Sequence, residues 1–165
     1  ANAEEQLQWL YQAVKQPDEV AVGECGLDKL RGASMSLQQE VFRACISLAE
    51  QMHLPLVVHA VKCTEELFRI HKELKPQMPW IIHGFRGRKE VAEQYLKRGF
   101  YLSFGEHFHD EALRSTPLER LLLETDESRL SMEEICRKAA SVYGLPAEIL
   151  AARITSNAQK VLFLQ

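Results

Sequence analysis

The chain has 165 residues, of which 46% are hydrophobic and 26% are charged, and this composition is that of a folded globular protein rather than a disordered or fibrous one. Its net charge of −3 excludes the broad basic surface of a protein that coats a nucleic-acid backbone. No stretch has the roughly 18 to 20 apolar residues that a bilayer-spanning helix needs. Its cysteines, Cys25, Cys45, Cys63 and Cys136, form no C-x-x-C pair. We therefore expect reduced thiols in a cytoplasmic protein without a membrane segment.

Helical patterns recur along the chain between short apolar runs. The first helix is expected over residues 3–15, and Ser36 with Gln39 forms a capping box that starts the next one. Thr64 is expected to cap a third helix, and a fourth covers about residues 88–98. Ser131 with Glu134 predicts one more capping box, for a helix that ends near Gly144, and Pro146 suits the first turn of the last helix.

Five apolar runs rich in Val, Ile and Leu alternate with these helices, at residues 20–23, 54–60, 80–85, 100–105 and 120–126. Such unalternating runs are typical of parallel strands that are buried on both faces. The order is compatible with an open doubly wound sheet or with a barrel. A nucleotide-binding open sheet would carry a glycine-rich first turn, which is absent, and a (β/α)₈ barrel needs eight strands. The lack of linkers, repeats and low-complexity segments predicts one domain over residues 1–165.

Polar side chains follow four of these runs. Glu24, His59, His83 and Asp126 each stand where a strand is expected to end. Because the carboxyl ends of parallel strands meet on one face, these side chains are expected to converge there. Imidazole and carboxylate ligands together suit Zn²⁺, Mn²⁺ or Mg²⁺. The alternative is that each residue is a hydrogen-bonded structural residue, which is the commoner role of a buried polar group taken alone.

Several motifs carry a family resemblance. They are "GECGLD" (23–28), "LPLVVHA" (54–60), "IHGFRG" (82–87), "LLLETD" (121–126) and "SNAQKVLF" (156–163). As an ordered set they resemble the TatD family of metal-dependent hydrolases, known mostly as deoxyribonucleases. The resemblance implies a TIM-type (β/α)₈ barrel, which this chain represents incompletely, with five clear parallel strands and the helices outside.

The same resemblance implies the role of each residue. Glu24 would bridge two divalent ions, His59 and His83 would complete the ligands of one, and Asp126 would ligate the other and act as the base. It implies one or two ions of Mg, Mn or Zn, and a metal-activated water that attacks a phosphodiester of DNA or of another substrate.

The chain departs from the family at its first strand, which usually carries an H-x-H pair of metal ligands. No such strand is present, and on barrel base rates about 50 residues and two strands are expected to be absent. His107 and His109 in "EHFHD" copy the spacing, but we interpret them as surface residues.

Other departures concern the substrate side of the site. Val61 stands where the family usually has an arginine, so Lys62 is one candidate for that charge, and Arg86 and Arg88 are candidates for holding a phosphate. The alternative is that both arginines are solvated residues that open a helix. Asp28 is assigned to the loop or to the support of a ligand, Cys25 to packing, and Asn157 to a structural cap or backbone contact.

Three hypotheses follow from these residues. The first is a cytoplasmic metal-dependent nuclease, a hydrolase of phosphodiester bonds. The second is an amidohydrolase-like metallohydrolase that acts on another ester or amide. The third is a catalytically impaired remnant that serves as a structural or interaction module. Missing strands would leave exposed sheet edges, so oligomerisation is also an expectation.

Overall fold

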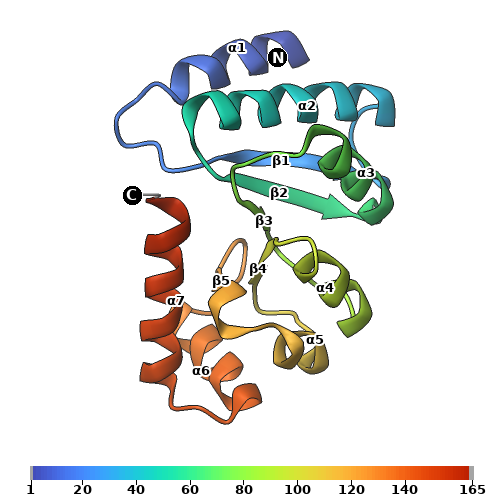
Figure 1. Ribbon diagram of the computed structural model, residues 1–165. Helices are drawn as coiled ribbons and strands as arrows, with labels where there is room; N and C mark the ends of the chain where they lie inside the picture. Colours follow the sequence, from blue (N-terminus) through green and yellow to red (C-terminus); the bar gives the residue numbers. More distant parts are fainter. Residues whose placement is uncertain (1, 164–165) are drawn as a thin grey trace. The chain divides into compact units, whose positions relative to one another are not determined.

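The computed structural model describes residues 2–163 and divides the chain into two compact units, one up to Trp80 and one from Ile81 onward (Figure 1). The first unit contains α1 (Ala3–Ala13), β1 (Val22–Asp28), α2 (Met35–Met52), β2 (Leu56–Val61) and α3 (Thr64–Leu74). The second contains α4 (Lys89–Leu96), β4 (Tyr101–Phe104), α5 (Asp110–Ser115), the 3₁₀ turn η1 (Leu118–Arg120), β5 (Leu121–Leu123), α6 (Met132–Tyr143) and α7 (Ala147–Leu162). The strand β3 (Trp80–Ile82) begins at the last residue of the first unit.

The first unit is built on one parallel strand pair. β1 pairs with β2 in a register that matches Gly26 to His59 and Asp28 to Val61, with an irregularity between Val22 and Cys25. α2 packs along β1, and α1 lies on the outer side of α2 (Figure 1). Burial of the apolar side chains of β1, β2 and α2 supplies the main stabilisation of this unit.

In the second unit β4 lies between two parallel partners, β3 and β5. Every residue of β4 and β5 is buried, as expected for strands covered on both faces. α4 packs on β4, and α6 and α7 pack on each other and on β5 (Figure 1). No helix within residues 2–163 has both the length and the apolar composition that a membrane crossing requires.

All five expected strands are present, and three of them, β1, β3 and β5, end at least three residues away from the expected position; β5 ends at Leu123 rather than at residue 126. β1 does not end at Gly23; its pairing with β2 continues to Asp28, because the two backbones stay in parallel register. β3 ends early, at Ile82, since Gly84 takes a φ of +57° and turns the chain. The carboxyl end of β1 is therefore Asp28, and Glu24 lies inside the strand.

The helices begin and end at some of the expected residues and not at others. The capping box of Ser131 with Glu134 and the left-handed stop at Gly144 are confirmed. The cap of α2 is Ser34, whose Oγ accepts from the backbone N–H of Leu37, so the prediction of Ser36 was wrong by two residues. α3 begins at Thr64, which is its first helical residue rather than its cap. The short elements α5 and η1 were not predicted.

The last helix is fixed to the strands by Asn157, a residue of the final motif. Asn157 is buried, and its Nδ2 donates to the carbonyl oxygens of Leu118 at 2.6 Å and Leu121 at 2.8 Å. These carbonyls belong to η1 and to the start of β5. The sequence-based expectation of a structural backbone contact for Asn157 is confirmed.

We expect Asn157→Ala to lower the free energy of unfolding by about 2 kcal/mol, because two carbonyl groups beneath α7 lose their donor. Urea denaturation followed by circular dichroism measures the change. The control is Ser156→Ala, at an exposed position of the same helix, with an expected change within about 0.5 kcal/mol. Equal stability of the two variants would contradict the anchoring role.

Candidate metal centre

Two of the four predicted ligands lie on the neighbouring strands of the first unit. The register of β1 and β2 pairs Gly26 with His59, and Glu24 lies two residues before Gly26 in β1. A carboxylate oxygen of Glu24 and a ring nitrogen of His59 lie within 4.8 Å of each other. Glu24 is exposed and the His59 side chain is 41% exposed. The structure thus brings these two predicted residues together where solvent reaches them.

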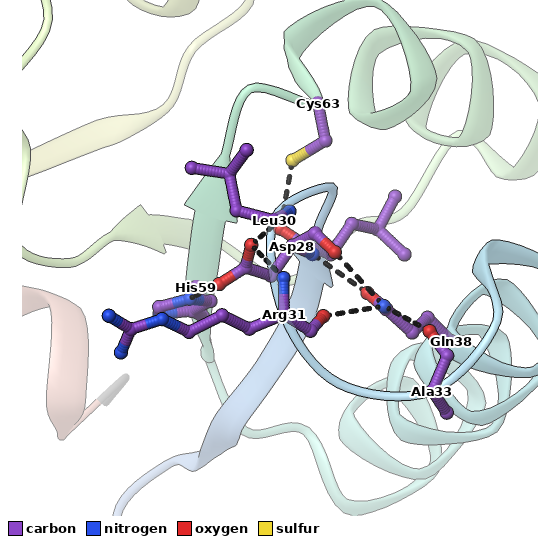
Figure 2. Close-up of polar contacts among 8 residues, drawn as sticks. Asp28, Leu30, Arg31, Ala33, Gln38, His59 and Cys63 are labelled. Atoms are coloured by element: carbon purple, nitrogen blue, oxygen red, sulfur yellow. Dashed lines mark hydrogen bonds and ion pairs between the residues drawn. The ribbon is translucent and has the colours of Figure 1, made fainter.

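The carboxylate of Asp28 closes the end of β1 and contacts His59 (Figure 2). Its Oδ1 accepts from the backbone N–H groups of Leu30 at 2.7 Å and Arg31 at 3.1 Å, while its Oδ2 lies 3.3 Å from Nε2 of His59. The Leu30 N–H, followed by the His59 contact, lowers the pKa of Asp28 below its usual value. Asp28 is therefore an ionised acceptor that faces His59 at neutral pH.

A glutamine from the first turn of α2 holds the loop after β1 (Figure 2). Gln38 accepts from the backbone N–H of Asp28 at 2.7 Å through Oε1. Its Nε2 lies within hydrogen-bonding distance of the carbonyl oxygens of Asp28, Arg31 and Ala33, at 2.8 to 3.1 Å. Gln38 was not predicted, because a polar residue at a helix start gives no pattern that distinguishes it from a solvated one.

The second unit brings together His83, directly after β3, and Asp126, three residues after β5. With Glu124 they form a group whose potential ligand atoms all lie within 4.8 Å of one another. The His83 side chain is 12% exposed and that of Glu124 is 18% exposed, whereas Asp126 is exposed and takes a φ of +45°. This group holds two of the predicted ligands and one carboxylate that was not predicted.

Glu124 is anchored from two sides. Its Oε1 lies 3.2 Å from Nδ1 of His83, and its Oε2 accepts a short hydrogen bond from Oγ of Ser103 on β4. Its backbone N–H donates to the carbonyl of Phe104. Glu124 lies inside the motif "LLLETD" (121–126), and its place in that motif is the sequence signal from which it could have been predicted.

The remaining predicted residues lie on exposed parts of their units. Lys62 follows β2, Arg86 lies in the loop after β3, and Arg88 caps α4 without a side-chain hydrogen bond. His107 and His109 are exposed and belong to no group of three potential metal ligands within residues 2–163. The structure therefore agrees with the interpretation of these two histidines as surface residues.

Cys25 lies beside Glu24 but faces another thiol. A hydrogen bond with Cys45 and burial both raise the pKa of Cys25, so the thiol is neutral. A neutral thiol is a poor metal ligand, which agrees with the expected packing role. All four cysteines are unpaired.

The donor set of imidazoles and carboxylates fits a divalent ion such as Zn²⁺, Mn²⁺ or Mg²⁺. Each unit contributes such donors from the ends of parallel strands, or from residues close to them. The fold and these donors define a parallel α/β protein with candidate ligands for a metal.

The chain belongs to the TatD family, because the family model described as TatD related DNase matches residues 1–163. It is 38% identical over 132 residues to a protein of Bacillus subtilis named uncharacterized metal-dependent hydrolase YabD, covering 74% of this chain and 52% of that one. It is 32% identical to the 3'-5' ssDNA/RNA exonuclease TatD of Citrobacter koseri, covering 82% of this chain and 56% of that one. The chain thus spans about half the length of these curated relatives.

Two crystal structures share the fold. A TatD homologue of Escherichia coli K12, YJJV, superposes with a TM-score of 0.85 at 23% identity, covering 99% of this chain and 72% of that one. A TatD family hydrolase of Entamoeba histolytica gives a TM-score of 0.83 at 19% identity, covering 98% and 68%. The barrel class expected from the motifs is confirmed.

Proposed function

We propose that this protein is a metal-dependent nuclease that hydrolyses phosphodiester bonds of DNA. The observation that carries the proposal is the group of His83, Glu124 and Asp126 at the strand ends of the second unit, in a chain of the TatD family. Relatives named as ssDNA/RNA exonucleases support a nucleic-acid substrate.

The proposed ligands are Glu24, His59, His83 and Asp126, for one or two ions of Mg, Mn or Zn. A bound ion of this class supplies Lewis-acid activation of a water and stabilises charge on the phosphate. Asp126 accepts the proton of the attacking water, since its exposed carboxylate reaches solvent. Glu24 has two carboxylate oxygens, so it is the residue suited to bridging two ions.

Three exposed cations are proposed to hold the substrate phosphates. Lys62 follows β2, whose strand carries His59, and Arg86 and Arg88 follow β3 within five residues of His83. Arginine presents a planar set of donors that matches phosphate oxygens. A few individual cations agree with the net charge of −3 better than an extended basic surface does.

We also propose that the protein functions in the cytoplasm as a single domain. Four unpaired cysteines support a reducing compartment.

Metal stoichiometry tests the proposed site. After saturation with Mn²⁺ or Zn²⁺ and desalting, elemental analysis of the wild-type chain is expected to find bound metal, with two equivalents for a binuclear site. Asp126→Asn is expected to lose one equivalent of the two, and Glu24→Gln to lower retention of both, because Glu24 would bridge the ions. A chain that retains no metal would contradict the proposal and favour the catalytically impaired remnant.

A further inference from the structure

Both predicted histidine ligands contact a carboxylate within their own unit. In the first unit Oδ2 of Asp28 lies 3.3 Å from Nε2 of His59 (Figure 2). In the second unit Oε1 of Glu124 lies 3.2 Å from Nδ1 of His83. The two contacts therefore use opposite nitrogens of the imidazole ring.

Each carboxylate is itself held in place. Two backbone N–H groups bind Oδ1 of Asp28, and Gln38 holds the backbone of the same residue on both its N–H and its carbonyl. Ser103 donates to the second oxygen of Glu124. A side chain fixed in this way has little freedom to turn from its histidine, so the direction of each contact is imposed by the fold.

From this geometry we infer that Asp28 and Glu124 are positioning residues that fix opposite tautomers of the two histidines, Nε2–H in His59 and Nδ1–H in His83. A carboxylate oxygen accepts hydrogen bonds, so a ring nitrogen that faces it donates and carries the hydrogen. The lone pair for a metal is then on Nδ1 of His59 and on Nε2 of His83. This inference rests on the proposed function only in assigning a metal to the two histidines.

A carboxylate that binds a histidine in this way raises the basicity of the ring and orients it for the metal. A competing arrangement has Glu124 as a direct ligand, since it belongs to the group of His83 and Asp126. In that arrangement Nδ1 of His83 would point its lone pair toward the ion beside Glu124, and the tautomer would be the opposite one.

The tautomers are measurable in the metal-free chain. Long-range ¹H–¹⁵N correlation spectra, recorded well above the usual imidazole pKa of about 6.5, distinguish the protonated ring nitrogen from the other. We expect the Nε2–H form for His59 and the Nδ1–H form for His83. The opposite form at either histidine would overturn the inference for that residue.

The amide variants Asp28→Asn and Glu124→Gln give the sharper test. The amide oxygen still accepts from the same donors, the backbone N–H groups in Asp28→Asn and Ser103 in Glu124→Gln. The amide N–H then faces the histidine, so the ring nitrogen on that side must become a hydrogen-bond acceptor. We expect inverted tautomers at His59 and His83 respectively, and an affinity for Zn²⁺ about 10- to 100-fold weaker by competition with a chromophoric chelator. A purely structural carboxylate would change the stability without inverting the tautomer.

Glu106→Gln is the matched control, because Oε2 of Glu106 lies 3.9 Å from Nε2 of the exposed His107. This variant is expected to leave both tautomers and the Zn²⁺ affinity unchanged. Unaltered tautomers and affinity in Asp28→Asn and Glu124→Gln would overturn the inference. A wild-type chain that binds no Zn²⁺ would instead contradict the proposed function, while the tautomers of the metal-free chain would still decide the positioning roles.

Discussion

Asp126→Asn is expected to lower kcat for phosphodiester hydrolysis by about 10²- to 10⁴-fold, the usual contribution of a positioned general base. The amide cannot accept the proton of the attacking water, and it is a weaker metal ligand than the carboxylate. The fold should be retained, because Asp126 is exposed at a φ of +45°, a conformation that asparagine tolerates. Initial rates with bis(p-nitrophenyl) phosphate and with a single-stranded oligonucleotide, in saturating Mn²⁺, measure the effect.

The matched control is Glu127→Gln, which removes an exposed carboxylate at the next position of the same loop. It is expected to keep kcat within about twofold, since its charge lies outside the proposed ligand set. If Asp126→Asn were as active as Glu127→Gln, Asp126 would not be the base.

The same assays distinguish the proposed substrates. Hydrolysis of bis(p-nitrophenyl) phosphate without cleavage of the oligonucleotide would support a phosphodiester hydrolase and would contradict DNA as its substrate. Activity on carboxylic esters or amides alone would favour the amidohydrolase-like alternative.

Gly26→Ala is expected to have the largest effect on stability, a loss of about 3 kcal/mol or more in the free energy of unfolding. Gly26 takes a φ of +152°, and a Cβ atom there would clash with the carbonyl oxygen of His59 and stand 2.9 Å from its carbonyl carbon. The atoms that would have to move are backbone atoms of β2, so the strand pair must separate. Urea denaturation of the purified chain measures the loss.

Gly99→Ala separates the clash from the cost of the backbone angle. Gly99 has a φ of +84°, but no atom lies within 4 Å of the position that a Cβ would take. Its expected loss is about 1 kcal/mol, the cost of placing a side chain at a positive φ. Similar losses for the two variants would show that the contact between β1 and β2 is looser than the structure indicates.

The close contact at Gly26 also bears on the metal centre. Gly26 is the partner of His59 in the register of β1 and β2, and it separates Glu24 from Asp28 along β1. Because residue 26 is a glycine, β1 and β2 can approach each other closely here. This is the place where the proposed ligand His59 faces its positioning residue Asp28. Loss of Zn²⁺ binding in Gly26→Ala would therefore accompany its loss of stability.

The sequence by itself determined the alternation of strands and helices, the family and four polar residues near strand ends. These features are local: apolar runs, caps and motifs are read from neighbouring positions, and Ser131, Gly144 and Asn157 took the roles that their motifs predicted. Even so, Glu24 was expected at a strand end and lies inside β1, because pairing with β2 extends the strand to Asp28.

Only the tertiary structure revealed the partners of the histidines. Asp28 lies 31 positions before His59, and Glu124 lies 41 positions after His83, so no local pattern connects either pair. Ser103 likewise binds Glu124 across 21 positions of the chain, whereas the partners of Gln38 lie within ten positions of it. Which nitrogen of a histidine faces a carboxylate depends on strand register and loop direction, and these are set by packing of distant segments rather than by the residues next to the histidine.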